Sequence, residues 1–350
     1  MNPRVNRKQQ IQGAIYGLSA AALFGASTPI SKSLLGSVHP VLLAGLLYLG
    51  AAGGLWLKRA VSPQSREAPI ARADYGRLMG VVLAGGIAGP ILMLLGLRHV
   101  TALSGSLLLN LESPFTMLLA VLLFREHLGR DAGIAASLIV LGAVALKLEP
   151  GGLQASTLGI ALLAAACACW ALDNNLTQRL SLCDPFAIVR IKSTIAGITN
   201  TALGLYVLKA QLPQAKIIAS ALVLGALSYG MSVVLITYSL RLVGAAREAA
   251  YFATAPFVGV LIAIIGFGES MHWYECVSML AMSIGVVLLV RERHSHVHAH
   301  EALEHEHLHE HDEHHQHSHS ALEPHSHVHR HEAMVHEHPH LSDLHHRHKH

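Results

Sequence analysis

The chain has 350 residues, of which 52% are hydrophobic and only 13% are charged, whereas a typical soluble domain carries about 25% charged residues. Nearly all of the hydrophobic residues precede residue 294, so this part of the chain has too few charges to cover a water-exposed exterior. The composition excludes an ordinary soluble domain, and the net charge of +3 is no sign of nucleic-acid binding.

Ten apolar runs follow one another along the first 291 residues. Most have about the 20 residues that a helix needs to cross the hydrocarbon core of a bilayer. The sequence therefore predicts an all-α integral membrane protein, with an N-terminal segment at 1–11 and ten transmembrane helices at 12–34, 40–57, 77–97, 102–124, 132–148, 157–178, 186–208, 217–240, 245–267 and 273–290.

The distribution of Lys and Arg predicts the orientation. If the N-terminus is cytoplasmic, most basic residues lie on the cytoplasmic side, and the opposite side holds only Arg98, Lys147, Lys209 and Lys216. The positive-inside rule then places both termini in the cytoplasm of a multi-pass protein of the inner (plasma) membrane. Met1 to Ser27 has the charge pattern of a signal peptide, but its apolar run continues through Ile30, which favours a retained first helix.

Short motifs recur in the two halves of the chain. The recurring pairs are Arg98–Ala102 with Arg241–Ala245, Pro114-Phe115 with Pro256-Phe257, and Glu126 with Glu269. The pairs predict two repeats, at 12–148 and 149–291, with five helices each. Because five is odd, the second repeat enters the membrane from the opposite side, an arrangement typical of secondary transporters.

These motifs resemble the drug/metabolite transporter superfamily, EamA type. The resemblance rests on Phe24-Gly25-Ala26 and Trp170-Ala171-Leu172 before polar residues, and on the Pro-Phe motifs with their trailing Glu. It covers roughly residues 12 to 291 and implies transport of small metabolites, amino acids, nucleotide-linked sugars or drugs. The chain departs from the pattern in its second helix, where relatives often carry an Arg and Ala44–Tyr48 is uncharged, whereas Arg190 and Lys192 follow Pro185.

Ionisable residues inside apolar runs are candidates for the solute path, because a charge at the bilayer centre costs at least about 2.5 to 3.5 kcal/mol on insertion scales. Glu112 precedes Pro114, and a proline within a helix frees a backbone carbonyl one turn earlier. A structural ion pair or an interhelical hydrogen bond is the alternative role for Glu112. For Glu248 the alternative is a local salt bridge with Arg247, and for Lys32 it is contact with the headgroups. We interpret Arg190 and Lys192 as positive-inside anchors. The candidate translocation residues are Lys32, Glu112, Pro114, Asp173, Asn174, Gln178, Glu248 and Pro256.

The segment 292–350 alternates histidine with other residues and has few apolar side chains, which predicts a disordered cytoplasmic tail. In an extended chain alternate residues project to one side, and imidazole binds Zn, Cu, Ni or Co without selecting one. The predicted metal ligands are His294, His296, His298, His300, His305, His307, His309, His311, His325, His327, His329 and His331. A pH-responsive solubilising tail is the alternative.

The sequence thus favours a secondary transporter that exports a small organic solute by alternating access. Two alternatives are a divalent metal exporter fed by the tail, and a membrane-embedded metal sensor or scaffold. We expect no enzymatic activity, because no constellation of nucleophile and base stands out, and no direct use of ATP, because the Gly-x-x-x-x-Gly-Lys motif is missing from the sequence. The expected partners are lipid, solute and metal ions, without a required cofactor or nucleic acid; a homodimer is left open.

Overall fold

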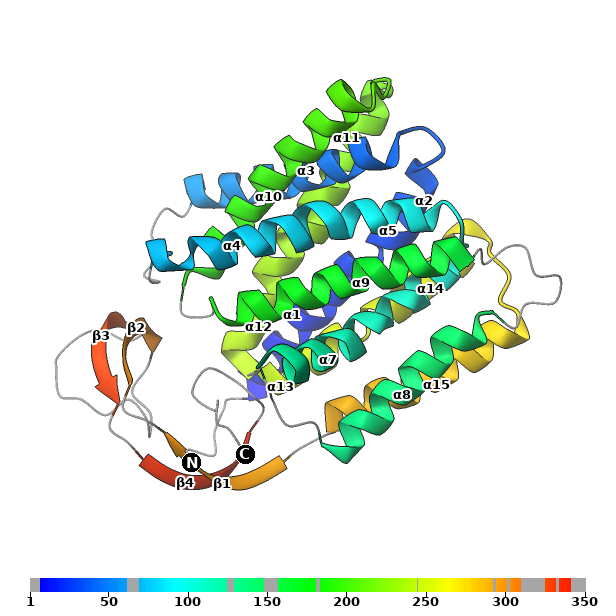
Figure 1. The fold of residues 1–350 in the computed structure, drawn as a ribbon. Helices are drawn as coiled ribbons and strands as arrows, with labels where there is room; N and C mark the ends of the chain where they lie inside the picture. The colour runs from blue at the N-terminus through cyan, green and yellow to red at the C-terminus, as the bar shows by residue number, and fades with distance from the viewer. Residues whose placement is uncertain are drawn as a thin grey trace.

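The computed structural model describes residues 7–61, 69–124, 129–147, 157–180, 183–243, 245–291, 294–300, 303–309, 325–331 and 334–340. Up to Arg291 the described chain is a bundle of helices (Figure 1). The all-α architecture predicted for this region is therefore confirmed, whereas the ten spans in two inverted repeats stay a prediction.

Several helices of the first half are broken into consecutive pieces. The elements are α1 (Arg7–Gly25), α2 (Ser27–Leu34), α3 (Pro40–Val61), the 3-10 turn η1 (Arg72–Asp74), α4 (Tyr75–Val81), the π-helical segment η2 (Val82–Ala88), α5 (Gly89–Leu97), α6 (Ala102–Leu108), the 3-10 turn η3 (Leu109–Leu111), α7 (Glu112–Phe124) and α8 (Arg130–Ala145).

The second half is built in the same way. Its elements are α9 (Thr157–Gln178), α10 (Pro185–Ala202), the π-helical segment η4 (Leu203–Val207), α11 (Ala215–Gly225), the π-helical segment η5 (Ala226–Met231), α12 (Ser232–Val243), α13 (Ala245–Phe252), α14 (Ala255–Phe267) and α15 (Trp273–Arg291).

In the described part of the chain, seven helical segments are long and apolar enough to cross a membrane, and Trp273–Leu289 is a shorter apolar helix. The seven coincide with predicted helices; those predicted at 132–148 and 186–208 form as helices but do not reach this standard. One reason is that α8 has only 16 residues. The other is that α10 carries Arg190 and Lys192 within its apolar run.

Helices from the two halves pack in pairs. The pairs with the most extensive contact include α8 with α15, α3 with α10, α1 with α12, α5 with α9, and α6 with α14. Figure 1 shows α8 and α15 side by side at one edge of the bundle. Small residues permit close approach of helices in lipid. At one such contact, a Cβ on Gly225 of α11 would lie 1.9 Å from the carbonyl oxygen of Leu47 in α3.

The structure describes part of the tail, and the disorder predicted from its composition stays a prediction. Four of its segments are strands: β1 (His294–His300) pairs antiparallel with β4 (Met334–His340), and β2 (Leu303–His309) with β3 (His325–His331). Alternation with a period of two residues is the pattern of a strand, and this pattern competes with the polar composition that favours disorder.

Candidate functional site

An ion pair lies deep in the helical bundle. The ammonium of Lys192 in α10 donates to Oδ2 of Asp173 in α9, and Thr177 Oγ1 donates to Asp173 Oδ1 over 3.2 Å. The Asp173 side chain is only 7% exposed and that of Lys192 16%. Both α9 and α10 pack against η2, which brings the two charges to the same level of the bundle.

A second carboxylate, that of Glu112, lies near this pair. Asn174 Nδ2 donates to Glu112 Oε1 over 2.6 Å, and Asn174 is exposed on the surface of the protein. Glu112 begins α7 directly after the 3-10 turn η3. The buried Pro114 follows two residues later, so the helix is interrupted where the Pro-Phe motif indicates unwinding.

The π-helical segment η2 supplies backbone acceptors beside the ion pair. The Gly85 carbonyl accepts from Tyr48 Oη at 2.7 Å and from Trp170 Nε1 at 3.2 Å, while the Gly86 carbonyl accepts from Asn200 Nδ2 at 3.2 Å. A π-helical turn displaces backbone groups from regular pairing and is frequently found at functional sites. Here it draws side chains from three other helices onto one turn.

An aromatic cluster adjoins this turn. The rings of Tyr48 and Tyr229 lie 5.6 Å apart, and Tyr229 also contacts Phe24 edge to face at 5.7 Å. Tyr229 Oη lies 3.5 Å from Ser27 Oγ, at the break between α1 and α2. The cluster therefore joins α1 and α3 to η5.

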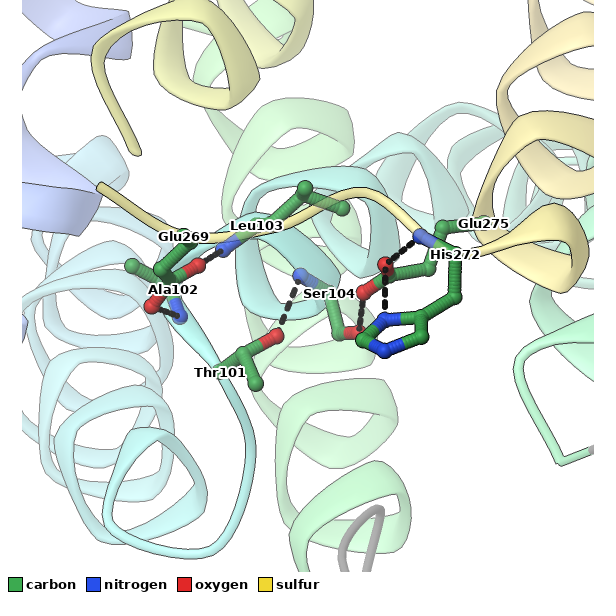
Figure 2. Close-up of polar contacts among 7 residues, drawn as sticks. All are labelled: Thr101, Ala102, Leu103, Ser104, Glu269, His272 and Glu275. Atoms are coloured by element: carbon green, nitrogen blue, oxygen red, sulfur yellow. Dashed lines mark hydrogen bonds and ion pairs between the residues drawn. The ribbon is translucent and has the colours of Figure 1, made fainter. Parts of the chain in front are cut away.

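A network of polar contacts joins the start of α6 to the segment that connects α14 with α15 and to the start of α15 (Figure 2). The Glu269 carboxylate, which follows α14, accepts the backbone N–H groups of Ala102 at 2.8 Å and Leu103 at 2.7 Å. These amides begin α6 and have no partner within their own helix. The contact links segments 167 residues apart in the chain.

The same network continues through Ser104. Its backbone N–H is capped by Thr101 Oγ1 at 3.0 Å, and its hydroxyl donates to Glu275 Oε1 at 3.0 Å. The other carboxylate oxygen of Glu275 accepts the backbone N–H of His272 at 2.9 Å. Figure 2 shows both carboxylates pointing toward the start of α6.

Lys32 lies at the end of α5, away from the Lys192–Asp173 ion pair. Its ammonium donates to the carbonyl oxygen of Leu97, the last residue of α5. The predicted candidates therefore separate into two groups, because Glu112, Pro114, Asp173 and Asn174 lie around α7 and α9.

The remaining candidates occupy other places. Gln178 is the last residue of α9, and Pro256 lies at the start of α14, directly after the break that follows α13. Glu248 in α13 is 8% exposed, and its Oε1 has no hydrogen-bond partner among the described residues, while neighbouring Arg247 is exposed.

Some functional candidates escape prediction from the sequence. Lys192 has a positive charge near a helix end, which by itself favours an anchoring role, and Tyr48 lies in an uncharged stretch. Gly85 contributes a carbonyl, which no side-chain pattern reveals. The Gly85-Gly86 pair inside an apolar run was the available signal, since paired glycines mark a close approach of backbones.

Of the predicted metal ligands, eleven lie in β1, β2 and β3, and His311 lies outside the described residues.

The model of the EamA-like transporter family matches the sequence twice, over residues 11–148 and 157–291. The chain belongs to the EamA-like transporter family. This agrees with the resemblance to EamA-type members of the drug/metabolite transporter superfamily. The chain is thus a multi-pass membrane transporter rather than a member of an enzyme family.

A relative agrees with the family assignment, and a solved structure has a similar fold. An uncharacterized transporter from Methanothermobacter thermautotrophicus (strain Delta H) is 31% identical over 299 residues, which cover 80% of this chain and 87% of that protein. A solved structure described only as the crystal structure of a protein superposes with a TM-score of 0.59 at 14% identity, over 79% of this chain and 96% of that chain. At that identity the likeness shows the fold alone.

Proposed function

We propose that this EamA-like transporter is a secondary transporter that exports a small organic metabolite or drug-like solute by alternating access, coupled to a proton or sodium gradient. The observation that carries the proposal is the buried Lys192–Asp173 pair, held against a π-helical turn with Glu112 and Asn174 nearby. Ionisable residues inside membrane helices are costly and face a path or a cavity. These four residues form the proposed solute site.

The arrangement of the helices supports two inverted halves. The contact of α1 with α12 has its counterpart in that of α9 with α5, and the contact of α7 with α9 has its counterpart in that of α14 with α1. Helices in equivalent positions also pair with each other, as α3 does with α10. Two halves related in this way rock against each other and expose a central site to either side.

The Glu269 network acts as the outer gate in this proposal. With cytoplasmic termini, the start of α6 faces the outside, and Glu269 of the second half is bound to the amides of Ala102 and Leu103 in the first half. The bonds must break when the site opens outward. In the proposed cycle, the outer end is closed while Glu269 is bound to the two amides and open when these hydrogen bonds are broken.

The experiment that tests the site is solute flux in proteoliposomes, after a growth and export screen of a deletion strain has identified the solute from a metabolite panel. Glu112→Gln and Asp173→Asn keep the shape of the side chains and remove their charge. Each is expected to lower gradient-driven flux at least about tenfold, the loss expected when about 1.4 kcal/mol of stabilisation is removed. Asp74→Asn, which alters a carboxylate in the turn before α4, is the matched control. Unchanged flux in both site variants would remove the assignment.

The tail favours a second role in metal binding. We propose that residues 294–350 bind Zn, Ni, Co or Cu in the cytoplasm and buffer or sense the metal while the helices carry the organic solute. The strand register places histidine opposite histidine, as at His296 with His338 and His307 with His327. Metal efflux is the alternative, and raised Ni, Co or Zn in cells that lack the protein would favour it.

A further inference from the structure

A groove opens on one side of the bundle, apart from the proposed solute site. It has a volume of about 580 Å³ and runs between the end of α3, the start of α4 and the start of α10. This volume lies within the range of about 300 to 1,000 Å³ that is common for small-molecule sites. Most of its lining is apolar.

The floor of the groove belongs to a small separate core. Leu78 of α4 packs in this core with Ile188 of α10, and Ile70 and Ile191 line both the core and the groove. Cys183 completes the core, and burial raises the pKa of its thiol, so that it packs as an uncharged apolar group. The floor is therefore well packed.

The open side of the groove is expected to face lipid. Tyr75 and Met79 line it, and both are more than half exposed although they lie in the membrane-spanning segment Arg72–Leu97. Apolar side chains exposed on a spanning helix contact acyl chains in a bilayer. The groove thus offers an apolar cleft to a molecule that is already in the membrane.

The mouth of the groove carries positive charge at the level of the helix ends. Arg59 lies in the last turn of α3, and Arg190 lies near the start of α10. The acid at the mouth, Asp184, is engaged as the N-cap of α10, where its Oδ1 accepts the backbone N–H of Phe186 at 2.8 Å. The two arginines therefore outweigh the one carboxylate.

The Arg190 guanidinium is positioned by an aromatic ring, and one of its nitrogens has no hydrogen-bond acceptor among the described residues. Its guanidinium lies over the ring of Trp56 at 4.9 Å, and Trp56 Nε1 donates to Thr194 Oγ1 at 3.1 Å, which ties the ring to α10. The buried Nε of Arg190 has no hydrogen-bond partner among the residues that the structure describes. Because Nε is closed to solvent, an anion at the mouth would be bound by the two terminal nitrogens of the guanidinium.

We propose that this groove binds a phospholipid with an anionic headgroup from the cytoplasmic leaflet, with its phosphate at Arg59 and Arg190 and an acyl chain along α4 and α10. Basic pockets between transmembrane helices on the cytoplasmic side are suited to anionic headgroups. The cytoplasmic placement follows from the orientation predicted by the basic residues.

The test is native mass spectrometry of the delipidated full-length chain with equimolar phosphatidylglycerol and phosphatidylcholine of the same acyl chains. The wild-type chain is expected to retain phosphatidylglycerol about tenfold over phosphatidylcholine, since each arginine near the surface contributes to anion preference. Arg59→Gln combined with Arg190→Gln should lower the preference to below about twofold. The control combines Arg130→Gln with Arg247→Gln, two exposed arginines outside the groove, and should keep it.

Two further measurements separate the lipid from other ligands. Ala187→Phe fills the apolar part of the groove and should reduce binding of both lipids, and glycerol phosphate should fail to displace the bound lipid. If the double groove variant does not fold, Arg59→Gln alone, at an exposed residue, should lower the preference about threefold. Equal loss in the groove and control variants, full binding by Ala187→Phe, or displacement by glycerol phosphate would each overturn the proposal.

Discussion

Asp173 and Lys192 each carry a charge into a part of the protein where water is scarce. Removing one partner of a buried ion pair costs about 3 to 5 kcal/mol, because the other charge is left uncompensated. Asp173 retains Thr177 as a hydrogen-bond donor when Lys192 is replaced. Loss of either partner alone should therefore destabilise the bundle, apart from any effect on the proposed solute site.

The first prediction is that the two charges are coupled. Asp173→Asn and Lys192→Gln should each lower the stability of the purified protein by about 3 kcal/mol, and the double variant should lose clearly less than the sum. Thermal or denaturant unfolding in detergent measures the coupling through a double-mutant cycle.

The exposed pair of Arg77 with Asp74 is the matched control. Arg77 Nη1 lies 2.6 Å from Asp74 Oδ1, but the Arg77 side chain is 52% exposed. A surface pair is worth at most about 1 kcal/mol, so its cycle should show little coupling. Equal coupling in the two pairs would contradict the buried role of Lys192.

At the residue scale, the sequence singles out the two acids and Asn174, the partner of Glu112, but not Lys192, the partner of Asp173. Asp173 and Glu112 interrupt apolar runs, which is visible in the sequence. Lys192 lies near a helix end, where a basic residue usually marks the cytoplasmic boundary. Only the packing of α9 and α10 on the same π-helical turn turns it toward Asp173.

At the scale of elements, the backbone of η2 lies very close to Asp173 of α9, and its π-helical turn displaces backbone groups from regular pairing. A Cβ on Gly85 would lie 1.9 Å from Oδ2 of Asp173. The second prediction is that Gly85→Ala destabilises the protein by about 1 to 3 kcal/mol, as overpacking of a core does, and abolishes the proposed transport by displacing Asp173. Unfolding and flux measurements check both effects.

Gly53→Ala is the control for this substitution. Gly53 lies within α3, and no atom lies within 4 Å of the Cβ that alanine would add. Alanine is favoured over glycine in helices by about 1 kcal/mol, so the control should be neutral or stabilised. A Gly85→Ala protein as stable and active as this control would show that α9 does not need the close approach.

The start of α6 gives the third prediction. Hydrogen bonds to charged groups contribute about 1.5 to 3 kcal/mol each, and Glu269 accepts two of them. Glu269→Ala should therefore shift the protein toward an open outer end. In a Leu103→Cys, Cys276→Ser background, an impermeant thiol reagent added outside the cell should label Cys at 103 at least about tenfold faster, because 1.4 kcal/mol is tenfold in an equilibrium.

The background for this experiment follows from burial. Leu103 is 0% exposed, and the smaller cysteine fits its place, whereas Cys276 is exposed and would react in every variant. Asp131→Ala, which removes an acid at the start of α8, is the control. If labelling rises equally in the control, or stays constant with Glu269→Ala, Glu269 does not hold the outer end closed.

The helix breaks show which interruptions can be predicted from sequence motifs. The Pro-Phe motifs indicate interruptions in both halves, and the structure breaks the helix at Leu109–Leu111 and again between Phe252 and Ala255. The π-helical segments were not predicted, because the extra residue in such a turn leaves the apolar composition unchanged. Their carbonyl acceptors were therefore invisible in the sequence.

For the whole molecule, the membrane character follows from composition, and the family was predictable from motifs that resemble it. The three apolar runs that fall short of a spanning helix show the limit of this approach. In α10 the residues that lower the apolar character include Lys192, which belongs to the proposed site. The helices that carry Asp173 and Glu112 are apolar enough to span, so only α10 loses its hydrophobic signal in this way.

The last prediction concerns the tail as an independent part. Truncation after Arg293 removes all but four of the 27 histidines. The purified wild-type chain should bind several zinc ions at pH 7.5, and the truncated chain close to none, as measured by equilibrium dialysis with elemental analysis. Because only neutral imidazole binds metal, and histidine protonates below about pH 6.5, the wild-type chain should release its zinc at pH 5.5.

The same truncation separates buffering from metal transport. If the tail buffers or senses metal, the truncated protein retains its gradient-driven solute flux, because Glu112, Asp173 and Lys192 all lie in the helical bundle that it keeps. A version in which every tail histidine is replaced by glutamine controls for the lost length. Should both variants lose solute flux, or should the wild-type protein move zinc across the vesicle membrane in a way that the truncated protein does not, the metal would be cargo rather than signal.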